Sequence, residues 1–222
     1  MKEFLNQYAV LLFDGTFDTL YMVFFATIFS YILGLPMGIA LYVTQKNSIL
    51  ENTAFNKIFG WIVNILRSIP FIILIITVMP VTRAIVGKAI GPTAAIIPLV
   101  IGSAPFVARM VESSLEEIDK GVIEACECMG ATAFEIITKV LIQEALPSII
   151  RGFSITAITL IAYSAMAGAV GAGGLGDIAI RYGYHRKIQN VMYISVVLVV
   201  ILVCIIQSVF GFIGKKVDKK CR

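Results

Sequence analysis

Few side chains in this chain could bind a metal or form disulfides. The sequence holds four cysteines and one histidine. Cys126 and Cys128 form a Cys-x-Cys pair, but His185 lies far from them, and this is not the spacing of a tetrahedral metal site. Together with Cys204 and Cys221 they are too sparse for the disulfide framework of a small secreted protein. We therefore expect free thiols and no bound metal.

A glycine run in the last third of the chain offers a second kind of chemistry. Gly171, Gly173 and Gly176 fit the G-x-G-x-x-G pattern of dinucleotide-binding proteins. That pattern binds a pyrophosphate only between a strand and a helix, with an acidic residue about 20 positions further on. Here the glycines end an apolar stretch that begins near Gly152. We expect them to allow close approach of membrane helices, or a break before Asp177.

Carboxylates are absent from the apolar stretches of the sequence. Carriers driven by protons or sodium ions generally place Asp or Glu within the membrane. The sequence also lacks the P-loop pattern G-x-x-x-x-G-K-[ST], the zinc motif H-E-x-x-H and the nucleophile elbow G-x-S-x-G. We predict that the chain is not an enzyme, has no catalytic residues and holds no cofactor. Energy for uphill transport would come from another subunit.

Composition identifies the solvent that these residues must face. Of the 222 residues, 59% are hydrophobic and 14% are charged, whereas soluble domains carry about 25% charged residues. This balance excludes a soluble globule and predicts a membrane protein. The net charge of +4 comes without a basic patch interleaved with aromatic residues, which argues against a nucleic-acid partner.

The apolar stretches predict the membrane spans. A bilayer core of about 30 Å takes roughly 20 helical residues. Five such stretches follow one another: 19–45, 58–82, 89–108, 152–176 and 188–214. Arg67 is the one charge inside them, and we expect it to hold the cytoplasmic end of its span or to line a path. The chain is predicted to be one all-α membrane domain, residues 1–222, with proline-kinked helices packed in a bundle.

The distribution of Lys and Arg predicts the orientation. Five spans put the termini on opposite sides, and basic residues are in excess on the cytoplasmic side. Placing the C-terminus inside assigns eleven bases to the cytoplasm: Lys46, Lys57, Arg109, Lys120, Lys139, Arg151, Lys215, Lys216, Lys219, Lys220 and Arg222. The other side receives six: Lys2, Arg83, Lys88, Arg181, Arg186 and Lys187. We therefore expect the N-terminus outside the cell.

The loop 109–151 contains a predicted helical hairpin. It holds eight of the fourteen acidic residues and is expected in the cytoplasm. Thr132 and Glu135 fit a capping box that begins a helix, and Gly130 stands where a preceding helix would end in a left-handed cap. We predict two short helices joined by a sharp turn. The apolar residues Phe134, Ile137 and Leu141 are expected on one face.

The hairpin sequence EACECMGATAFEIITKVLIQEALP resembles the cytoplasmic loop of ABC importer permeases. Cys126 stands where that family usually has a second Ala. The resemblance implies that the loop is a coupling helix that contacts a cytoplasmic ATPase. The residues expected in this contact are Glu124, Ala125, Gly130, Ala131, Phe134, Leu146 and Pro147.

Further segments, among them LRSIPFIILI, IGPTAAIIPL, APFVARMVE and YSAMAGAVGAGGLGDIAIRYGY, are similar to the methionine-uptake branch of that family. The resemblance implies a type I ABC importer permease with five spans in the bacterial plasma membrane. Its implied partners are a second copy, two cytoplasmic ATP-binding subunits, an extracytoplasmic methionine-binding lipoprotein and membrane lipid. Tyr163 and Met166 lie three residues apart on one helix face, and we expect them to face the path of a thioether substrate.

Other functions remain open from the residues alone. A permease for another amino acid or small solute would have the same spans and loop. A secondary carrier is disfavoured by the missing membrane carboxylates, and a plain membrane scaffold would have no use for proline-broken spans.

Overall fold

The computed structural model describes residues 2–217, with side chains from residue 8 onward except that of residue 215. Helices make up its regular structure, and the described residues contain no strand. The bases Lys219, Lys220 and Arg222 of the tail, and the thiol of Cys221, lie outside this range. In chain order the elements are α1 (Lys2–Val43), α2 (Thr53–Ser68), α3 (Phe71–Val86), α4 (Pro92–Glu116), α5 (Lys120–Cys128), α6 (Ala133–Glu135), the π-helix η1 (Ile136–Leu141), α7 (Ile142–Gly168), α8 (Gly174–Ile178), the π-helix η2 (Ala179–His185) and α9 (Gln189–Val217).

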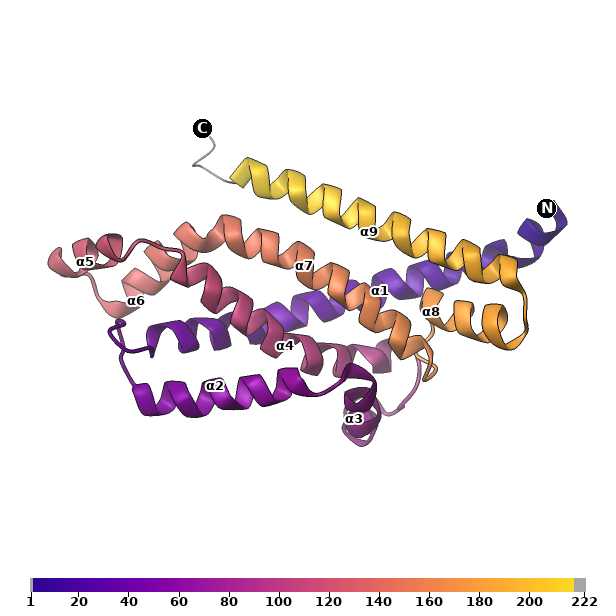
Figure 1. The fold of residues 1–222 in the computed structure, drawn as a ribbon, viewed down its shortest axis with the longest axis horizontal. Helices are drawn as coiled ribbons and strands as arrows, with labels where there is room; N and C mark the ends of the chain where they lie inside the picture. Colours follow the sequence, from indigo (N-terminus) through magenta and orange to yellow (C-terminus); the bar gives the residue numbers. More distant parts are fainter. Residues whose placement is uncertain (1, 218–222) are drawn as a thin grey trace.

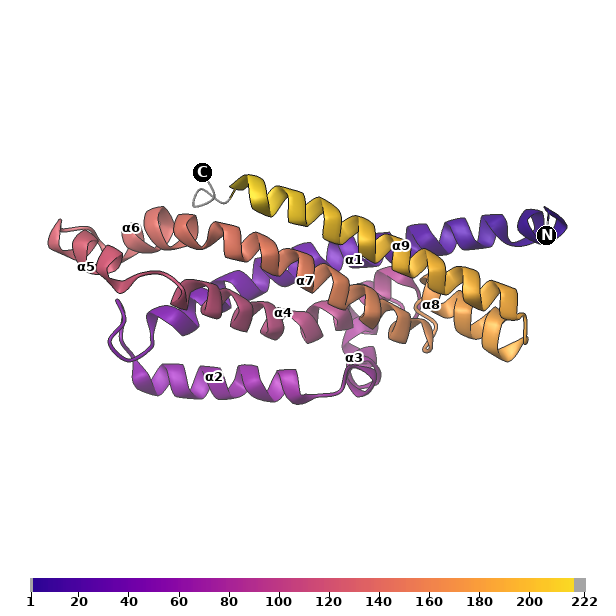
Figure 2. The same ribbon diagram turned by 45° about the horizontal axis from the view of Figure 1, so that its top comes forward.

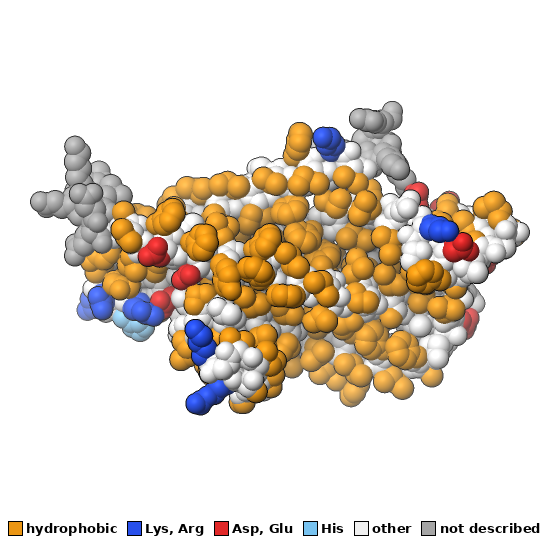
Figure 3. All heavy atoms as spheres, turned by 180° about the vertical axis from the view of Figure 1, so that it is seen from behind, with side chains coloured by type: hydrophobic (Ala, Val, Ile, Leu, Met, Phe, Trp, Pro, Cys, Tyr) orange, Lys and Arg blue, Asp and Glu red, His pale blue; other side chains and the backbone are white. Residues whose placement is uncertain are grey.

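Four long helices form an elongated bundle. In Figures 1 and 2, α1, α4, α7 and α9 run along the long axis, with α5 and α6 at one end and α8 at the other. Figure 3 shows that acidic and basic side chains gather toward the two ends, while the middle of that face is almost wholly hydrophobic. This distribution matches a bundle whose middle lies in lipid and whose ends meet water.

The α1–α4 contact is close because α1 carries two glycines four residues apart. A Cβ added to Gly34 would lie 2.6 Å from Cβ of Val107, and one added to Gly38 would lie 2.4 Å from the carbonyl oxygen of Ala108. Gly-x-x-x-Gly lets two helix backbones approach within a membrane. The hydroxyl groups of Ser30 and Ser103 also form a hydrogen bond across this interface.

The expected span 58–82 is not one helix. The chain ends α2 at Ser68, and α3 begins at Phe71 at an angle of 105° to it. Ile69 is extended (ψ 122°) because the ring of Pro70 disfavours helical backbone in the residue before it. Among the described residues, four helices are long and apolar enough to cross a membrane, or five if the bent pair counts as one span.

The predicted loop and fourth span also differ from the observed helices. The stretches 89–108 and 188–214 correspond to α4 and α9 apart from their ends, but α4 continues to Glu116. The segments α6, η1 and α7 form one helix of 36 residues, Ala133–Gly168, so the second helix of the hairpin is long rather than short. It ends at Gly168, before the expected limit at residue 176.

The glycine run forms the turn after α7. Gly171, Gly173 and Gly174 all have positive φ, which residues with a side chain rarely adopt. A Cβ on Gly176 would lie 2.4 Å from Cα of Ala165, so α8 packs backbone to backbone on α7. Close helix approach and a break before Asp177 are therefore both confirmed for this run.

Candidate functional site

The hairpin turn is built by local backbone bonds. The N–H of Gly130 donates to the carbonyl oxygen of Glu127 (2.9 Å) and that of Ala131 to the carbonyl oxygen of Cys126 (3.0 Å). These two bonds close α5 in a Schellman motif, which needs a left-handed residue at Gly130; its φ is +80°. The predicted left-handed cap is confirmed, and nothing lies within 4 Å of a Cβ added there.

The capping box that follows the turn is also confirmed. The N–H of Glu135 donates to Oγ1 of Thr132 (3.3 Å), and the N–H of Thr132 donates to Oε2 of Glu135 (3.2 Å). Nζ of Lys139 lies 3.0 Å from Oε1 of Glu135. Caps on both sides of the turn therefore satisfy backbone groups at the end of α5 and at the start of α6.

One side of this hairpin packs on the bundle, and the other side is exposed. Ile123 is buried and packs with Leu141 in the apolar cluster at this end. On the outside, Met129 is 78% exposed and Phe134 is 74% exposed. The expected common face of Phe134, Ile137 and Leu141 is therefore wrong, because Leu141 is 0% exposed. The π-helix η1 (Ile136–Leu141) has more residues per turn than an α-helix, so Leu141 no longer lies on the same face as Phe134.

We call the exposed residues Val122, Glu124, Ala125, Met129, Gly130 and Phe134 the tip surface. It includes four of the seven residues expected to contact an ATPase, and the partly buried Ala131 adjoins it. Leu146 and Pro147 do not lie there. They line a groove of about 670 Å³ beside it, which also contains Val122, Glu144 and Val217. Glu117, Asp119 and Arg151 also line the groove, so this end of the molecule exposes apolar and charged side chains next to one another.

The second group of candidate residues lies on α7. The ring of Tyr163 stacks on Phe71 of α3, with centroids 4.5 Å apart and planes inclined by 4°. Met166, one turn further along, is 48% exposed and is not part of that core. The two predicted path residues therefore differ in surroundings. The sequence does not identify Phe71 as a neighbour of Tyr163, since nothing in its spacing shows that α3 turns back toward α7.

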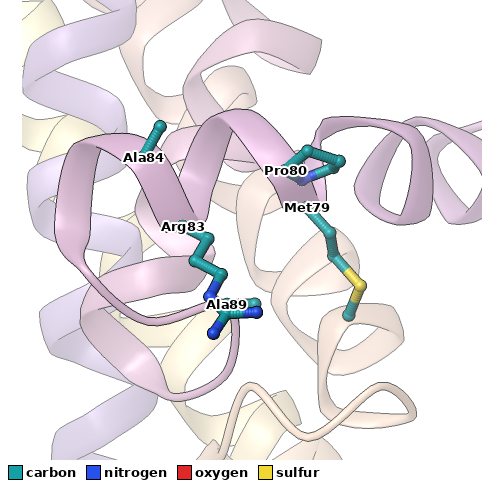
Figure 4. A pocket seen from close by; sticks show the side chains of 5 residues that line it. All are labelled: Met79, Pro80, Arg83, Ala84 and Ala89. Carbon is teal, nitrogen blue, oxygen red and sulfur yellow. The ribbon is translucent and has the colours of Figure 1, made fainter.

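A pocket of about 520 Å³ opens on α3, and the sequence does not identify it either. Figure 4 shows the side chain of Arg83 reaching across it toward Ala89, with Met79 and Pro80 on the same helix. Gly87 ends α3 in the left-handed conformation and starts the return of the chain. Arg67, by contrast, lies exposed in the last turn of α2.

A third arrangement joins the helices near the hairpin end. Nη1 of Arg109 lies 2.7 Å from Oε2 of Glu112, and Nη2 donates to the carbonyl oxygen of Gly60 on α2 (2.9 Å). Nε2 of Gln45, just beyond α1, donates to Oε1 of Glu112 (3.0 Å) and to Oε1 of Glu116 (2.8 Å). The sequence by itself indicates only a cytoplasmic charge at Arg109.

This arrangement of apolar helices, broken second span and projecting hairpin is that of a polytopic membrane protein. A family model described as "Binding-protein-dependent transport system inner membrane component" matches residues 30–221. The chain belongs to this family of inner-membrane permease components.

Curated relatives match almost the whole chain. The probable D-methionine transport system permease protein MetI of Vibrio cholerae is 50% identical over 210 residues, 95% of this chain and 93% of that protein. The methionine import system permease protein MetP of Bacillus subtilis is 45% identical over 219 residues, 99% of each chain.

Solved structures show the same fold. A chain of the inward-facing methionine ABC transporter MetNI matches with a TM-score of 0.95 and 49% identity, covering 96% of this chain and 99% of that one. A chain of an amino acid ABC transporter matches with a TM-score of 0.78 at 18% identity, which bears on the fold alone. The chain has the type I ABC importer permease fold, as expected from its sequence.

Proposed function

We propose that this protein is the transmembrane permease subunit of an ATP-driven methionine importer and forms the path for D-methionine, L-methionine or both across the bacterial plasma membrane. The observation that carries this proposal is the 50% and 45% identity to methionine permeases over nearly the full chain. The fold is consistent with it, since the chain provides helices and a hairpin but no nucleotide-binding sequence. ATP hydrolysis takes place on a separate subunit.

The importer contains two copies of this chain, two cytoplasmic ATP-binding subunits and an extracytoplasmic methionine-binding lipoprotein. Exposed apolar surface supports such an assembly. Trp61 on α2 is 67% exposed, and the most apolar part of α9 has no buried residue. Surfaces of this kind are covered by lipid or by another membrane subunit.

The hairpin faces the cytoplasm, and α8 faces the outside. The helix Ala133–Gly168 has 36 residues and is therefore about 54 Å long, well beyond the roughly 30 Å of a bilayer core. Its first turns project into water, where the tip surface contacts the ATP-binding subunit. Glu124, Ala125, Gly130, Ala131 and Phe134 form this contact, and Leu146 and Pro147 border it across the groove.

The path runs past α7. Tyr163 supplies an aromatic ring held in place by Phe71, and Met166 supplies a half-exposed thioether one turn away. A flexible thioether accommodates an unbranched thioether substrate through polarizable contacts.

Reconstitution tests the function. The chain is placed in proteoliposomes with its ATP-binding subunit and binding lipoprotein, and uptake of radiolabelled L- and D-methionine is measured with ATP inside. We expect uptake that requires ATP and the lipoprotein and that unlabelled methionine suppresses. Vesicles with a hydrolysis-deficient ATP-binding subunit are the control. ATP-driven uptake of another amino acid without methionine uptake would contradict the proposed substrate, and uptake without ATP would contradict the class.

A further inference from the structure

Helix α2 contacts α4 through a small buried area near the hairpin end of the bundle. Gly60 and Val63 are the buried residues of α2, and its other side carries the exposed Phe55, Ile58 and Trp61. Helix α2 therefore touches its own bundle along one narrow stripe. Val63 packs there with Leu41 and Ala108.

The guanidinium of Arg109 adds a hydrogen bond to this contact between α2 and α4. Arg109 of α4 donates to the backbone oxygen of Gly60 while it pairs with Glu112. The absence of a side chain at residue 60 makes room for the bond, because a Cβ there would lie 3.0 Å from Nη2 of Arg109. A charged donor makes such a bond stronger than one between neutral groups.

The arrangement favours a permanent bond over a switch. Glu112 is 6% exposed, and its two oxygens are held by Arg109 and Gln45. Withdrawing Arg109 would leave a buried carboxylate without its cation, which is strongly unfavourable. Glu112 therefore fixes the guanidinium of Arg109 through Nη1, and Nη2 donates its hydrogen bond to the carbonyl oxygen of Gly60 on α2.

Helices α4 and α2 connect the proposed ATPase contact with the proposed methionine path. Helix α4 continues within a few residues into α5 and the tip surface, while α2 continues through Pro70 into α3, which carries Phe71 under Tyr163. We propose that Arg109 is a positioning residue: it makes α2 move with α4 as one body, so that displacement of the hairpin by the ATP-binding subunit reaches α3. This inference rests on the proposed function, because it needs an ATP-driven hairpin.

Distance measurements in the unsubstituted network test the rigid connection. Spin labels are attached to Lys57→Cys on α2 and Ser113→Cys on α4, both exposed positions, in an otherwise cysteine-free chain. An excess of unlabelled copies limits each dimer to one labelled chain. We expect the same label distance in the nucleotide-free and ATP-bound complexes. A change of more than about 2 Å, the scale of interface helix shifts, would overturn the proposal.

Two substitutions test its consequence for transport. Arg109→Gln removes the guanidinium donor. Gly60→Ala places a Cβ 3.0 Å from Nη2 of Arg109, so that Nη2 must shift by a few tenths of an ångström from its place beside the Gly60 carbonyl oxygen. Arg109→Gln should lower methionine uptake per ATP hydrolysed by about tenfold, as expected for loss of a charge-assisted hydrogen bond. Gly60→Ala should lower it by a smaller factor, and both variants should broaden the α2–α4 distance. Lys57→Gln and Gly211→Ala are the controls, since nothing lies within 4 Å of a Cβ at Gly211.

The outcomes are separable. Unchanged uptake per ATP in Gly60→Ala, with the complex assembled, would overturn the role of Arg109 and leave the importer function intact. If Arg109→Gln does not assemble, Gly60→Ala and the label distances decide. Absence of ATP-driven methionine uptake by the unsubstituted complex would instead contradict the proposed function itself.

Discussion

At the scale of single residues, Gly130 combines a special backbone with an exposed position. Its φ of +80° closes α5, and no atom of this chain would obstruct a side chain there. We expect Gly130→Leu to insert into the membrane but to bind the ATP-binding subunit poorly and lose coupled uptake. The left-handed backbone costs a residue with a side chain roughly 1–2 kcal/mol, and the leucine would project from the tip surface.

Gly130→Asn is the matched variant, because asparagine tolerates the left-handed conformation better than leucine does. It should retain more ATPase association than Gly130→Leu in a pull-down from detergent. Normal association and uptake in both variants would remove this turn from the coupling mechanism.

Tyr163 and Met166 give a second prediction at this scale. Met166→Ala should lower methionine uptake by about tenfold, because it removes the polarizable thioether that faces the proposed path. Tyr163→Phe keeps the ring that stacks on Phe71 and removes only the hydroxyl group. It should alter uptake while dimer assembly and basal ATP hydrolysis persist, as measured in proteoliposomes.

Val200→Ala, at a position 53% exposed on α9, is the control for loss of an apolar side chain. Uptake like that of the parent protein in both α7 variants would show that Tyr163 and Met166 only pack.

At the scale of elements, the close α1–α4 contact leaves no room for larger side chains at its glycines. In Gly38→Ala the new Cβ would meet the backbone oxygen of Ala108, which cannot rotate away. We expect α1 and α4 to separate locally, with a loss of about 1–3 kcal/mol, the usual range for overpacking. Thermal unfolding in detergent should show a lower midpoint. The same substitution at Gly211 should leave the midpoint unchanged or raise it, since Ala favours helix more than Gly does.

At the scale of the whole molecule, the orientation predicted from the base count can be measured. A membrane-impermeant maleimide should label Lys187→Cys, in the turn before α9, on intact cells. In a second variant that keeps Cys128 on the hairpin as its single cysteine, the maleimide should label Cys128 only after the membrane is made permeable. The reverse pattern would place the hairpin outside the cell and would exclude contact with a cytoplasmic ATPase.

Much of this protein follows from the sequence alone. The excess of apolar residues requires a membrane, and the caps around Gly130 and Thr132 require a hairpin, because each depends on groups only a few residues apart. Pro70 breaks the second span for an equally local reason, although the expected outcome was a kink rather than a bend of 105°.

The tertiary structure decided which of these groups meet. Gly60 and Arg109 are 49 residues apart, and no periodicity predicts that one presents its carbonyl oxygen to the other. Phe71 reaches Tyr163 only because α3 turns back across the bundle. The opposite surroundings of Phe134 and Leu141 depend on a π-helical segment inside a longer helix. Backbone preferences are set by near neighbours in sequence, whereas these contacts arise from how whole helices pack, and only the folded chain determines that.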